Sequence, residues 1–333
     1  MKTCIQVDRI IGLDGTGSPP VSIVIDEAGF ISDVDVKDNE PFDCRLLDRR
    51  GYTALPLLTD CHIHLGISND VMESPDFHRL DLINGQLRNY LECGVGHVHS
   101  LGTDQPWLQE ELDRRRAANN FKQVAIGYSA GIGFGALGGW PGEFTSPAPR
   151  FRPETPEEAS QQVRQLAKRG ARTLKIWVDD LGGQVPKLPL PVARAIIDEA
   201  RRHGMTTFAH IFFLKDAADL LEAGIHVLAH SIRDTRADPQ FAEKIAEKGV
   251  ILAPTLARED AELAFAREGN PYFENHVFQK AAGNHLSSSR KLRTGGTRTL
   301  DELCHMRDLA LMNFRTLTDA GVKVCLGTDS GFK

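Results

Sequence analysis

The chain has 333 residues, of which 41% are hydrophobic and 25% charged, and its formal net charge is −6. This length suits about two domains or one large α/β barrel, and the negative balance argues against a nucleic-acid partner or an anionic membrane surface. No apolar run reaches the ~20 residues that span a bilayer.

The cysteines and the first residues predict a cytoplasmic protein with reduced thiols. Met1–Asp8 places an acid where a signal peptide needs its apolar stretch. The cysteines are scattered, without C-x-x-C spacing. They are Cys4, Cys44, Cys61, Cys93, Cys304 and Cys325.

Residues 1–53 are predicted to form a small, partial β-sandwich domain. Val21–Ile25 alternates in polarity, residues 15–20 form a loop, and Phe30–Val34 follows a turn at Gly29. Such an element is too small to hold a good core alone, so we expect it to pack on a later part of the chain.

From residue 54 onward a unit of helix, glycine and short apolar strand repeats. A glycine just past a helix adopts the left-handed conformation that closes the last turn. The runs that follow are almost wholly apolar, as buried parallel strands are. The glycines at these junctions are Gly94, Gly170, Gly204, Gly224, Gly249 and Gly321.

Adding strands at 54–61 and 122–128 gives eight strands that alternate with helices. Thr155-Pro156 and Asp238-Pro239 are typical helix starts, with a capping side chain followed by proline. The sequence therefore predicts an α/β protein with a (β/α)8 TIM barrel over residues 54–333.

Two long segments interrupt the pattern of short loops. Residues 129–153 are rich in glycine, proline and aromatic residues, and residues 258–298 form a polar insertion containing Ser287–Ser289 and Gly295-Gly296. Because both follow strands, we expect them on the carboxyl-terminal face of the barrel, as lids, pocket walls or surface excursions without a role.

Polar residues gather at the predicted carboxyl ends of the strands, where barrel enzymes place their chemistry. His62 and His64 point the same way, because side chains alternate along a strand, and can bind one metal ion together. A single histidine at a strand end is commonly structural, but that explanation would have to hold independently at every position. The full set is His62, His64, Lys175, His210, His230 and Asp329.

Lys175 leaves two readings open. An ammonium group facing the interior is costly to desolvate, so its pKa can fall, and a neutral amine can react with carbon dioxide to give a bridging carbamate. Alternatively, the side chain reaches the rim and pairs with Asp179 or Asp180.

Arg233 and Tyr128 are the predicted substrate-binding residues. Arg233 follows His230 by three positions and could grip a substrate carboxylate with two hydrogen bonds, unless it pairs with Asp234 or Asp238. Tyr128 could donate to a carbonyl oxygen, unless it has a structural partner.

These motifs resemble the metal-dependent amidohydrolase superfamily. The resemblance rests on His62-x-His64, Lys175, His210, His230 and Gly327-Thr328-Asp329, and covers about residue 20 to the end. Lys175–Asp180 and His230–Asp234 resemble the imidazolonepropionase-like branch, which includes Xaa-Pro dipeptidases. Pro56–Asp60 departs from the family, which usually has Gly after the proline and Ile before the acid.

The resemblance implies a two-metal hydrolase of amide bonds in a dipeptide, an N-acyl amino acid or a cyclic amide. His62, His64 and Asp329 would hold one ion, His210 and His230 a second, with carbamylated Lys175 bridging them. Such ligands suit zinc, and manganese, cobalt or iron stay open. A metal-bridging hydroxide would attack the carbonyl, with Asp329 as general base.

Three further expectations concern the whole chain. It ends 333 − 329 = 4 residues after Asp329, so we expect a truncated barrel that lacks its last helix. A non-catalytic scaffold and a single-metal hydrolase with unmodified Lys175 are the rival hypotheses. The partners expected are a small-molecule substrate and, as an open alternative, further copies of the chain, with neither nucleic acid nor membrane.

Overall fold

The structure is a computed structural model, which describes residues 1–34, 44–68, 74–121, 123–142, 150–266, 274 and 298–331. The chain folds into two compact units, Met1–Leu58 and Thr59–Lys333. Each unit is described by itself.

The first unit is a four-stranded sheet in the order β3-β2-β1-β4. Its strands are β1 (Lys2–Ile10), β2 (Val21–Ile25), β3 (Ile31–Val34) and β4 (Cys44–Ala54). β1 pairs antiparallel with β2 and parallel with β4. Cys4, Val7 and Val24 are buried on this sheet, whereas all four residues of β3 are exposed. The strands predicted near residues 21–25 and 30–34 are confirmed.

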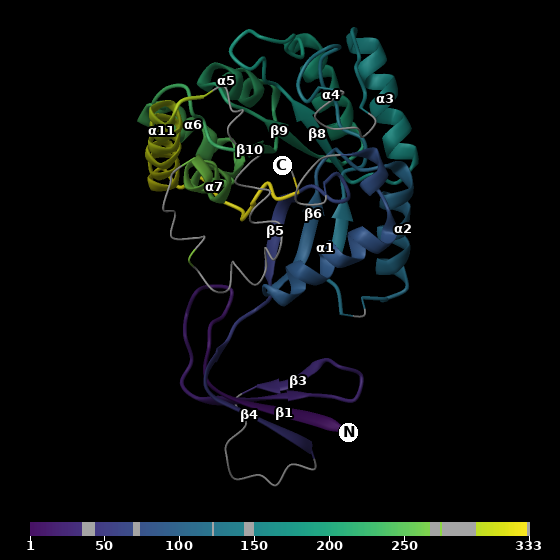
Figure 1. Ribbon diagram of the computed structural model, residues 1–333, viewed down its shortest axis with the longest axis vertical. Helices are drawn as coiled ribbons and strands as arrows, with labels where there is room; N and C mark the ends of the chain where they lie inside the picture. Colours follow the sequence, from purple (N-terminus) through teal and green to yellow (C-terminus); the bar gives the residue numbers. More distant parts are fainter. Residues whose placement is uncertain are drawn as a thin grey trace. The chain divides into compact units, whose positions relative to one another are not determined.

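The second unit holds two further sheets, which Figure 1 shows surrounded by helices. One has the order β5-β6-β7 and the other β11-β10-β9-β8. The strands are β5 (Leu58–Ile63), β6 (Val95–Ser100), β7 (Ile126–Ser129), β8 (Thr173–Trp177), β9 (Thr206–His210), β10 (Val227–Ala229) and β11 (Ile251–Ala253). β6 and β7 are parallel, and so are all neighbours in the β8–β11 sheet.

Single parallel bridges continue the pairing beyond these sheets. Phe134 bridges to Ile176 beside β8, Leu252 of β11 bridges to Val324, and Ser330 bridges to Ile63 of β5. In the predicted eighth strand at 322–327, Val324 bridges to β11 and Leu326 O accepts a hydrogen bond from Cys61 N of β5 at 2.8 Å, so the segment contacts both strands without forming a regular strand. The strand predicted at 122–128 begins later, at Ile126.

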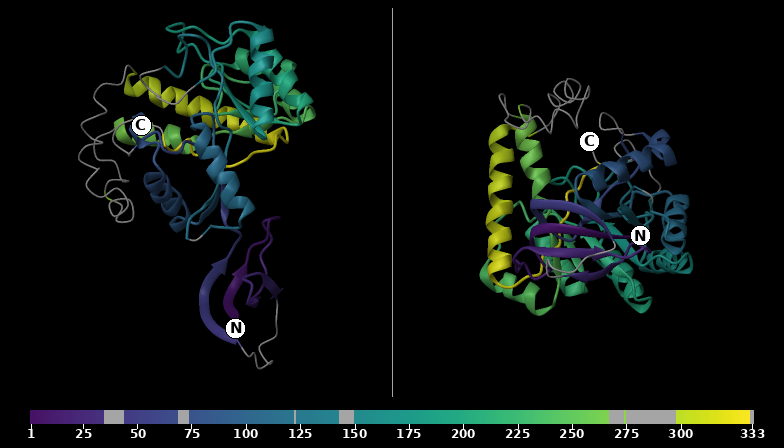
Figure 2. Two further views of the ribbon diagram at one scale, coloured as in Figure 1. Left: turned by 90° about the vertical axis from the view of Figure 1, so that its right-hand side faces the viewer. Right: turned by 90° about the horizontal axis from the view of Figure 1, so that it is seen from below.

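Helices follow the strands as the sequence predicts, and Figure 2 shows them from two further sides. The described α-helices are α1 (Leu80–Glu92), α2 (Pro106–Ala117), α3 (Pro156–Lys168), α4 (Leu190–Arg202), α5 (Leu214–Ala223), α6 (Pro239–Glu247), α7 (Leu256–Ala266) and α11 (Leu300–Asp319). Thr155 and Asp238 cap α3 and α6 by accepting hydrogen bonds from the amides of Glu158 and Phe241, as predicted. None of the helices within the described segments is long and apolar enough to cross a membrane.

The core lies on both faces of the parallel strands. One cluster packs the outward side chains of the β8–β11 sheet against α3–α6, and includes Ile176, Ile196 and Leu228. A smaller cluster on the other face contains Leu101, Phe208 and Ala253. Burial on both faces explains why these strands are apolar throughout.

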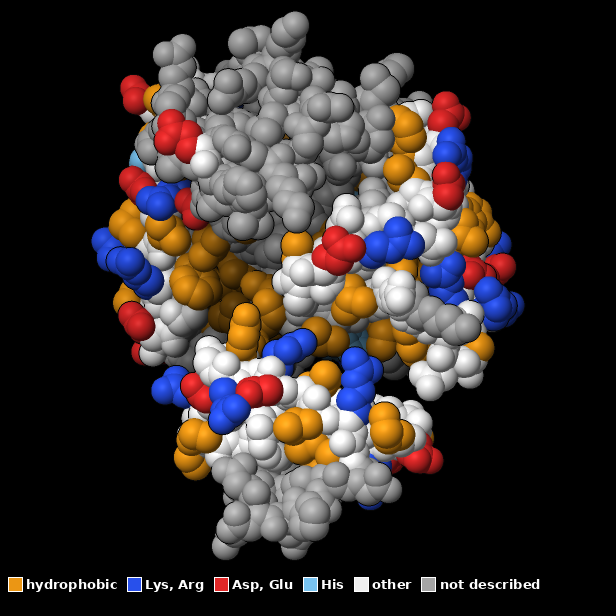
Figure 3. Space-filling view, turned by 60° about the horizontal axis from the view of Figure 1, so that its bottom comes forward, with side chains coloured by type: hydrophobic (Ala, Val, Ile, Leu, Met, Phe, Trp, Pro, Cys, Tyr) orange, Lys and Arg blue, Asp and Glu red, His pale blue; other side chains and the backbone are white. Residues whose placement is uncertain are grey.

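The insertion predicted at 258–298 begins as a helix, since α7 covers Leu256–Ala266. The rest of that prediction, with its serine and glycine runs, lies outside the described residues, as do residues 143–149 of the other long segment. Figure 3 shows hydrophobic side chains at the surface of both units. The large exposed hydrophobic residues include Phe30 in the first unit and Val324 and Leu326 in the second.

Candidate metal centre

His62 and His64 lie at the end of β5 and are fully buried. Ile63 between them packs on the opposite face, against Ile83 and Leu87 of α1. This alternation turns both imidazoles to one side, as the sequence predicts.

Asp329 meets both imidazoles with one carboxylate oxygen. Its Oδ1 lies 3.2 Å from His62 Nε2 and 3.1 Å from His64 Nε2. Its backbone amide donates to His62 O at 2.8 Å, and its φ of 58° is in the left-handed region that non-glycine residues rarely adopt. Gly331 allows the close approach, because a Cβ there would lie 1.9 Å from His64 O.

The geometry of these three residues fits a metal ion. Their ligand atoms all lie within 4.8 Å of one another. Bonds of ~2.0–2.1 Å to a tetrahedral zinc ion would separate neighbouring ligand atoms by about 3.3 Å. The observed nitrogen–oxygen separations of 3.1 and 3.2 Å are close to that value.

The protonation states also suit a metal. Burial lowers the pKa of His64 to about 4 and holds the pKa of His62 well below its usual value, so both imidazoles are neutral near pH 7. Burial alone would raise the pKa of Asp329, but His62, His64 and Arg258 outweigh it and keep the carboxylate ionised. Metal ligation requires neutral imidazole and ionised carboxylate.

Lys175 faces this cluster from β8. Its side chain is fully buried, and Nζ lies 3.0 Å from His62 Nε2 rather than beside Asp179 or Asp180. Burial lowers the pKa of Lys175 to about 7. The reading in which this lysine reaches the rim is therefore wrong, because the side chain points inward.

His210 and His230 complete the group. His230 has a φ of 75°, and its Nδ1 hydrogen-bonds with Thr255 Oγ1 at 2.9 Å. Its ring centroid lies 4.7 Å from that of His62 and 4.4 Å from that of His210. His210 Nε2 lies 3.1 Å from Asp179 Oδ2. The structure thus brings together all six residues predicted at the strand ends.

Arg233 lies close to this group but is already paired. Its guanidinium is buried and forms an ion pair with Glu259, not with Asp234 or Asp238. It also donates to the backbone carbonyl of Ile211.

Tyr128 contacts side chains outside the group of six predicted residues. Its ring stacks on His97 and contacts His99, and the guanidinium of Arg116 covers it. His99 hydrogen-bonds with Thr173, two residues before Lys175 on β8. Tyr128 is the third residue of β7 and pairs with His99 of β6, and no contact among the described residues joins it to Asp329.

Sequence reasoning missed the residues that hold the ligands. Thr103 Oγ1 hydrogen-bonds with His64 Nδ1 at 2.9 Å. Asp60 accepts hydrogen bonds from the amides of His62 and Thr328 and from the Thr328 hydroxyl. Arg258 of α7 lies 3.2 Å from Asp329 Oδ2. Only Asp60, buried two residues before His62, carried a local signal in the sequence.

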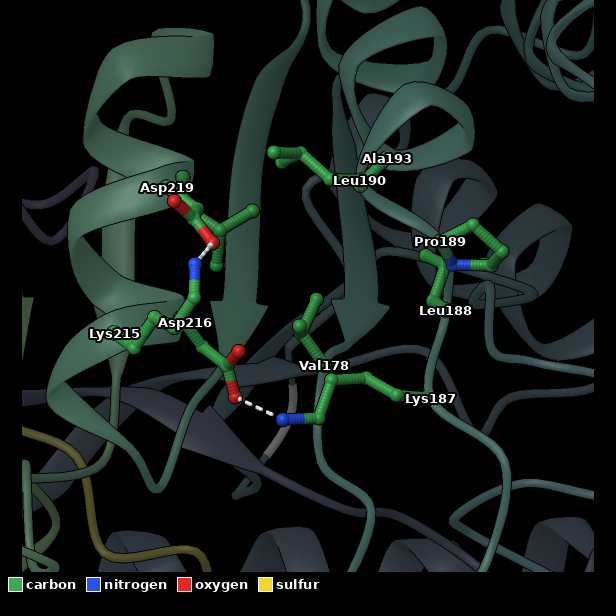
Figure 4. A pocket seen from close by; sticks show the side chains of 10 residues that line it. Val178, Lys187, Leu188, Pro189, Leu190, Ala193, Lys215, Asp216 and Asp219 are labelled. Atoms are coloured by element: carbon green, nitrogen blue, oxygen red, sulfur yellow. Dashed lines mark hydrogen bonds and ion pairs between the residues drawn. The ribbon is translucent and has the colours of Figure 1, made fainter. Parts of the chain in front are cut away.

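A cavity of about 320 Å³ lies elsewhere, between α4 and α5 (Figure 4). Val178 and Leu188 contribute apolar lining, and Lys187 Nζ pairs with Asp216 Oδ2 at 2.7 Å. No residue predicted at the strand ends lines this cavity.

No protein-family profile and no curated protein matches the chain. Solved structures do. A Xaa-Pro dipeptidase with methionine bound in its active site gives a TM-score of 0.73 at 21% identity, over 100% of this chain and 80% of the dipeptidase. An amidohydrolase gives a TM-score of 0.73 at 19% identity, and the match covers 99% of this chain and 78% of the amidohydrolase. Ochratoxinase from A. niger gives a TM-score of 0.68 at 19% identity, and the match covers 99% of this chain and 76% of the ochratoxinase.

These comparisons define the class of fold. The chain is a mixed α/β protein that shares its fold, over nearly its whole length, with amidohydrolases and a Xaa-Pro dipeptidase. The resemblance read from the sequence is thereby confirmed at the level of fold, and the described residues add a candidate metal site formed by His62, His64 and Asp329.

Proposed function

We propose that the protein is a metal-dependent hydrolase that cleaves a C–N amide bond in a small molecule. The observation that carries the proposal is the approach of two neutral imidazole nitrogens to one ionised carboxylate oxygen, at 3.1 and 3.2 Å. The names of two structural neighbours, a Xaa-Pro dipeptidase and an amidohydrolase, support it. The proposed substrate is a dipeptide, an N-acyl amino acid or a cyclic amide. Within the amidohydrolase superfamily, the proposed branch is the imidazolonepropionase-like one, which includes the Xaa-Pro dipeptidases.

We further propose that residues 54–333 form a (β/α)8 barrel without its last helix, beside a partial β-sandwich domain at 1–53. The single bridges at Phe134, Val324 and Ser330 support a closed ring, because they link the ends of the two parallel sheets. The site would then lie at the carboxyl ends of the strands, where such barrels hold their chemistry.

In the proposed centre, His62, His64 and Asp329 would hold one zinc ion, His210 and His230 would hold a second, and Lys175 as a carbamate would be a further ligand. The buried amine of Lys175, with a pKa of about 7, supports a reaction with carbon dioxide. When bound, the ions would lower the pKa of a water molecule and polarise the amide carbonyl.

The side chains of the protein orient the ligands and transfer the proton. Asp329 is the proposed general base, and Arg258 at 3.2 Å keeps its carboxylate ionised and oriented. Thr103 and Thr255 each bind the Nδ1 atom of one histidine, which fixes the ring orientation of His64 and His230, and His64 thereby directs its Nε2 atom at Asp329.

Substrate recognition remains a prediction for Arg233 and Tyr128. Arg233 could bind a carboxylate only by exchanging its ion pair with Glu259. Arg258, whose side chain is 31% exposed, is a second candidate, because it already lies beside Asp329.

We retain a reducing, cytoplasmic location as part of the proposal. No disulfide joins any of the six cysteines, all of which lie among the described residues. A small-molecule substrate is the partner, and assembly into a homo-oligomer remains open.

The test is a hydrolysis screen of dipeptides, N-acyl amino acids and lactams with zinc-loaded and chelator-treated protein. Asp329→Asn should lower turnover by about 10²–10⁴-fold, as expected for loss of a general base. Asp180→Asn is the matched control, because Asp180 pairs with Lys187 outside the centre. A folded protein that binds no metal and hydrolyses none of these substrates would support the scaffold hypothesis instead.

The number of metal ions is tested separately through Lys175. If its carbamate bridges two ions, Lys175→Ala should abolish binding of the second equivalent, and removal of bicarbonate should slow reconstitution of the wild type. Unchanged activity in Lys175→Ala, with no effect of bicarbonate, would favour the single-metal hydrolase with an unmodified lysine.

A further inference from the structure

Asp104 is a fully buried acid in the turn between β6 and α2, and the proposed mechanism assigns it no role. We infer that Asp104 is a positioning residue for the metal centre, which together with two serine hydroxyls holds His64 in the orientation that metal binding needs. This inference rests on the proposed function, because it concerns one of the proposed zinc ligands.

The carboxyl group of Asp104 joins the ends of two neighbouring strands. Ser100, the last residue of β6, donates its hydroxyl to Oδ1 at 2.6 Å. Ser129, the last residue of β7, donates its hydroxyl to Oδ2 at 2.5 Å. The two serines are partners in the parallel register of β6 and β7, so one carboxyl group links both strand ends. We call Asp104, Ser100 and Ser129 the Asp104 cluster.

Backbone hydrogen bonds fix the Asp104 cluster on the side of β7. The hydroxyl of Ser129, which donates to the acid, also accepts a hydrogen bond from the amide of Gly131 at 2.9 Å. The amide of Asp104 donates to the carbonyl oxygen of Gly131 at 3.3 Å. The turn that carries Asp104 is therefore held against the segment that follows β7 by its side chain and by its backbone.

Two contacts connect the Asp104 cluster with His64. Thr103, which directly precedes the acid, hydrogen-bonds through Oγ1 with His64 Nδ1 at 2.9 Å. The hydroxyl of Ser100 accepts a hydrogen bond at 3.0 Å from the amide of Leu65, the residue after His64. The imidazole and the adjoining backbone are thus held from the same cluster, while His64 Nε2 lies 3.1 Å from Asp329 Oδ1.

An acid at this position is costly for the fold. Burial raises the pKa of Asp104 to about 7, and the hydrogen bonds from Ser100 and Ser129 offset only part of that rise. Within the described residues, the groups that bind Asp104 are these hydroxyls and the carbonyl of Gly131, rather than a cation. Such a buried acid destabilises a protein, and groups of this kind are concentrated at functional sites.

The alternative is that the Asp104 cluster stabilises the fold without influencing His64. Truncation of Asp104 would then lower stability and leave the zinc affinity of the folded protein unchanged. Asp216 provides the matched control, because it is also a buried acid, 7% exposed, and its Oδ2 pairs with Lys187 Nζ at 2.7 Å outside the centre. Asp216→Ala removes a buried carboxyl group without touching the residues around His64.

The first measurement is the affinity of the folded, metal-free protein for its first equivalent of zinc. Asp104→Ala should bind this ion about 10–100-fold more weakly than the wild type, as expected when a ligand loses its orienting partners. Asp104→Asn should recover most of the affinity, because an amide offers an acceptor oxygen and a donor, as a protonated carboxyl group does. Asp216→Ala should bind zinc as the wild type does.

Two results of this titration would be contrary to expectation, and they differ in what they exclude. Wild-type zinc affinity in Asp104→Ala would overturn the inference and leave the proposed function intact. A wild type that binds no zinc would contradict the proposed function itself.

The second measurement observes His64 by NMR spectroscopy of the zinc-bound protein with isotope-labelled histidine. When Nε2 binds the ion, Nδ1 carries the proton, and its hydrogen bond to Thr103 should protect that proton from exchange with water. The wild type and Asp216→Ala should show the Nδ1 proton signal of His64, and Asp104→Ala should lose it. A signal that persists unchanged in Asp104→Ala would assign the cluster to the fold alone. If Asp104→Ala does not fold, Ser100→Ala gives the same comparison, because it removes the link to Leu65.

Discussion

The buried histidines of the proposed centre give the metal-free protein a defined acid response. Burial lowers the pKa of His64 and of His210 to about 4 in the folded chain. In the unfolded chain these groups titrate near 6.5, so below that pH the unfolded chain binds protons that the folded chain does not.

The free energy of unfolding should therefore fall as the pH is lowered from about 6.5 to 5, by about 1.4 kcal/mol per pH unit for each such histidine. Urea unfolding of the metal-free protein at several pH values measures this slope. His210→Gln should reduce this slope by the contribution of one histidine. Stability that is flat over this interval would contradict neutral, buried imidazoles.

Lys175 should change the free energy of unfolding at alkaline pH. Burial lowers its pKa from 10.5 to about 7, so between these values the unfolded chain holds a proton that the folded chain lacks. Stability should therefore rise with pH from about 7 to 10, provided that bicarbonate is excluded. Lys175→Met removes the titrating group and should flatten this rise in the same unfolding experiment. An equal rise in the variant would assign it to other groups.

Single residues also define how far sequence reasoning reaches. The motif positions could be recognised because strand alternation turns His62 and His64 to one side, and because Lys175, His210 and His230 lie in or directly after the apolar strands β8, β9 and β10. The ion pair of Arg233 could not be recognised from the sequence, because Glu259 lies 26 positions later and reaches Arg233 only through the packing of α7. Thr103 and Thr255 were missed for the same reason: a hydroxyl in a loop has no pattern until the fold brings it to an imidazole.

At the scale of elements, the end of β6 passes so close to β8 that glycine is required. Gly102 has a φ of 80°, and a Cβ there would lie 2.7 Å from Lys175 Cβ and 2.7 Å from the Trp177 ring. Gly94 has a φ of 81° but open space around it. The two positions share the same backbone conformation and differ only in what surrounds them.

Gly102→Ala should therefore destabilise the protein by about 1–3 kcal/mol more than Gly94→Ala, because overpacking adds to the cost of the left-handed backbone. Urea unfolding of the two variants beside the wild type measures the difference. Equal losses of stability would mean that the ends of β6 and β8 can separate without cost.

The elements themselves were predictable where the pattern is local. Capping residues and prolines gave the starts of α3 and α6, and the apolar runs gave β8, β9 and β10. Local patterns did not predict the secondary structure where contacts with residues distant in the sequence determine it. The segment at 322–327 has the composition of a strand but makes only isolated bridges, with Val324 42% and Leu326 50% exposed. The polar start of the 258–298 insertion folds as α7 because Leu263 packs into the core and Arg258 and Glu259 find charged partners.

At the scale of the whole molecule, the two-metal hydrolase, the single-metal hydrolase and the scaffold differ in how metal couples to folding. An ion that binds only the folded chain stabilises it by RT ln(1 + [L]/Kd), about 4 kcal/mol at a thousand times Kd. The ligands come from both ends of the second unit, since His62 and Asp329 are 267 positions apart by number (329 − 62 = 267). Zinc should therefore stabilise this unit as a whole.

Thermal unfolding with zinc and with a chelator measures this coupling. The wild type should unfold at a higher temperature with zinc, and His64→Ala should lose most of the difference. His203→Ala is the control, because His203 lies at the end of α4, where its Nε2 is 3.3 Å from Glu199. It should keep the full response to zinc. A wild type that responds to zinc no more than His64→Ala would rule out both hydrolase hypotheses and leave the scaffold.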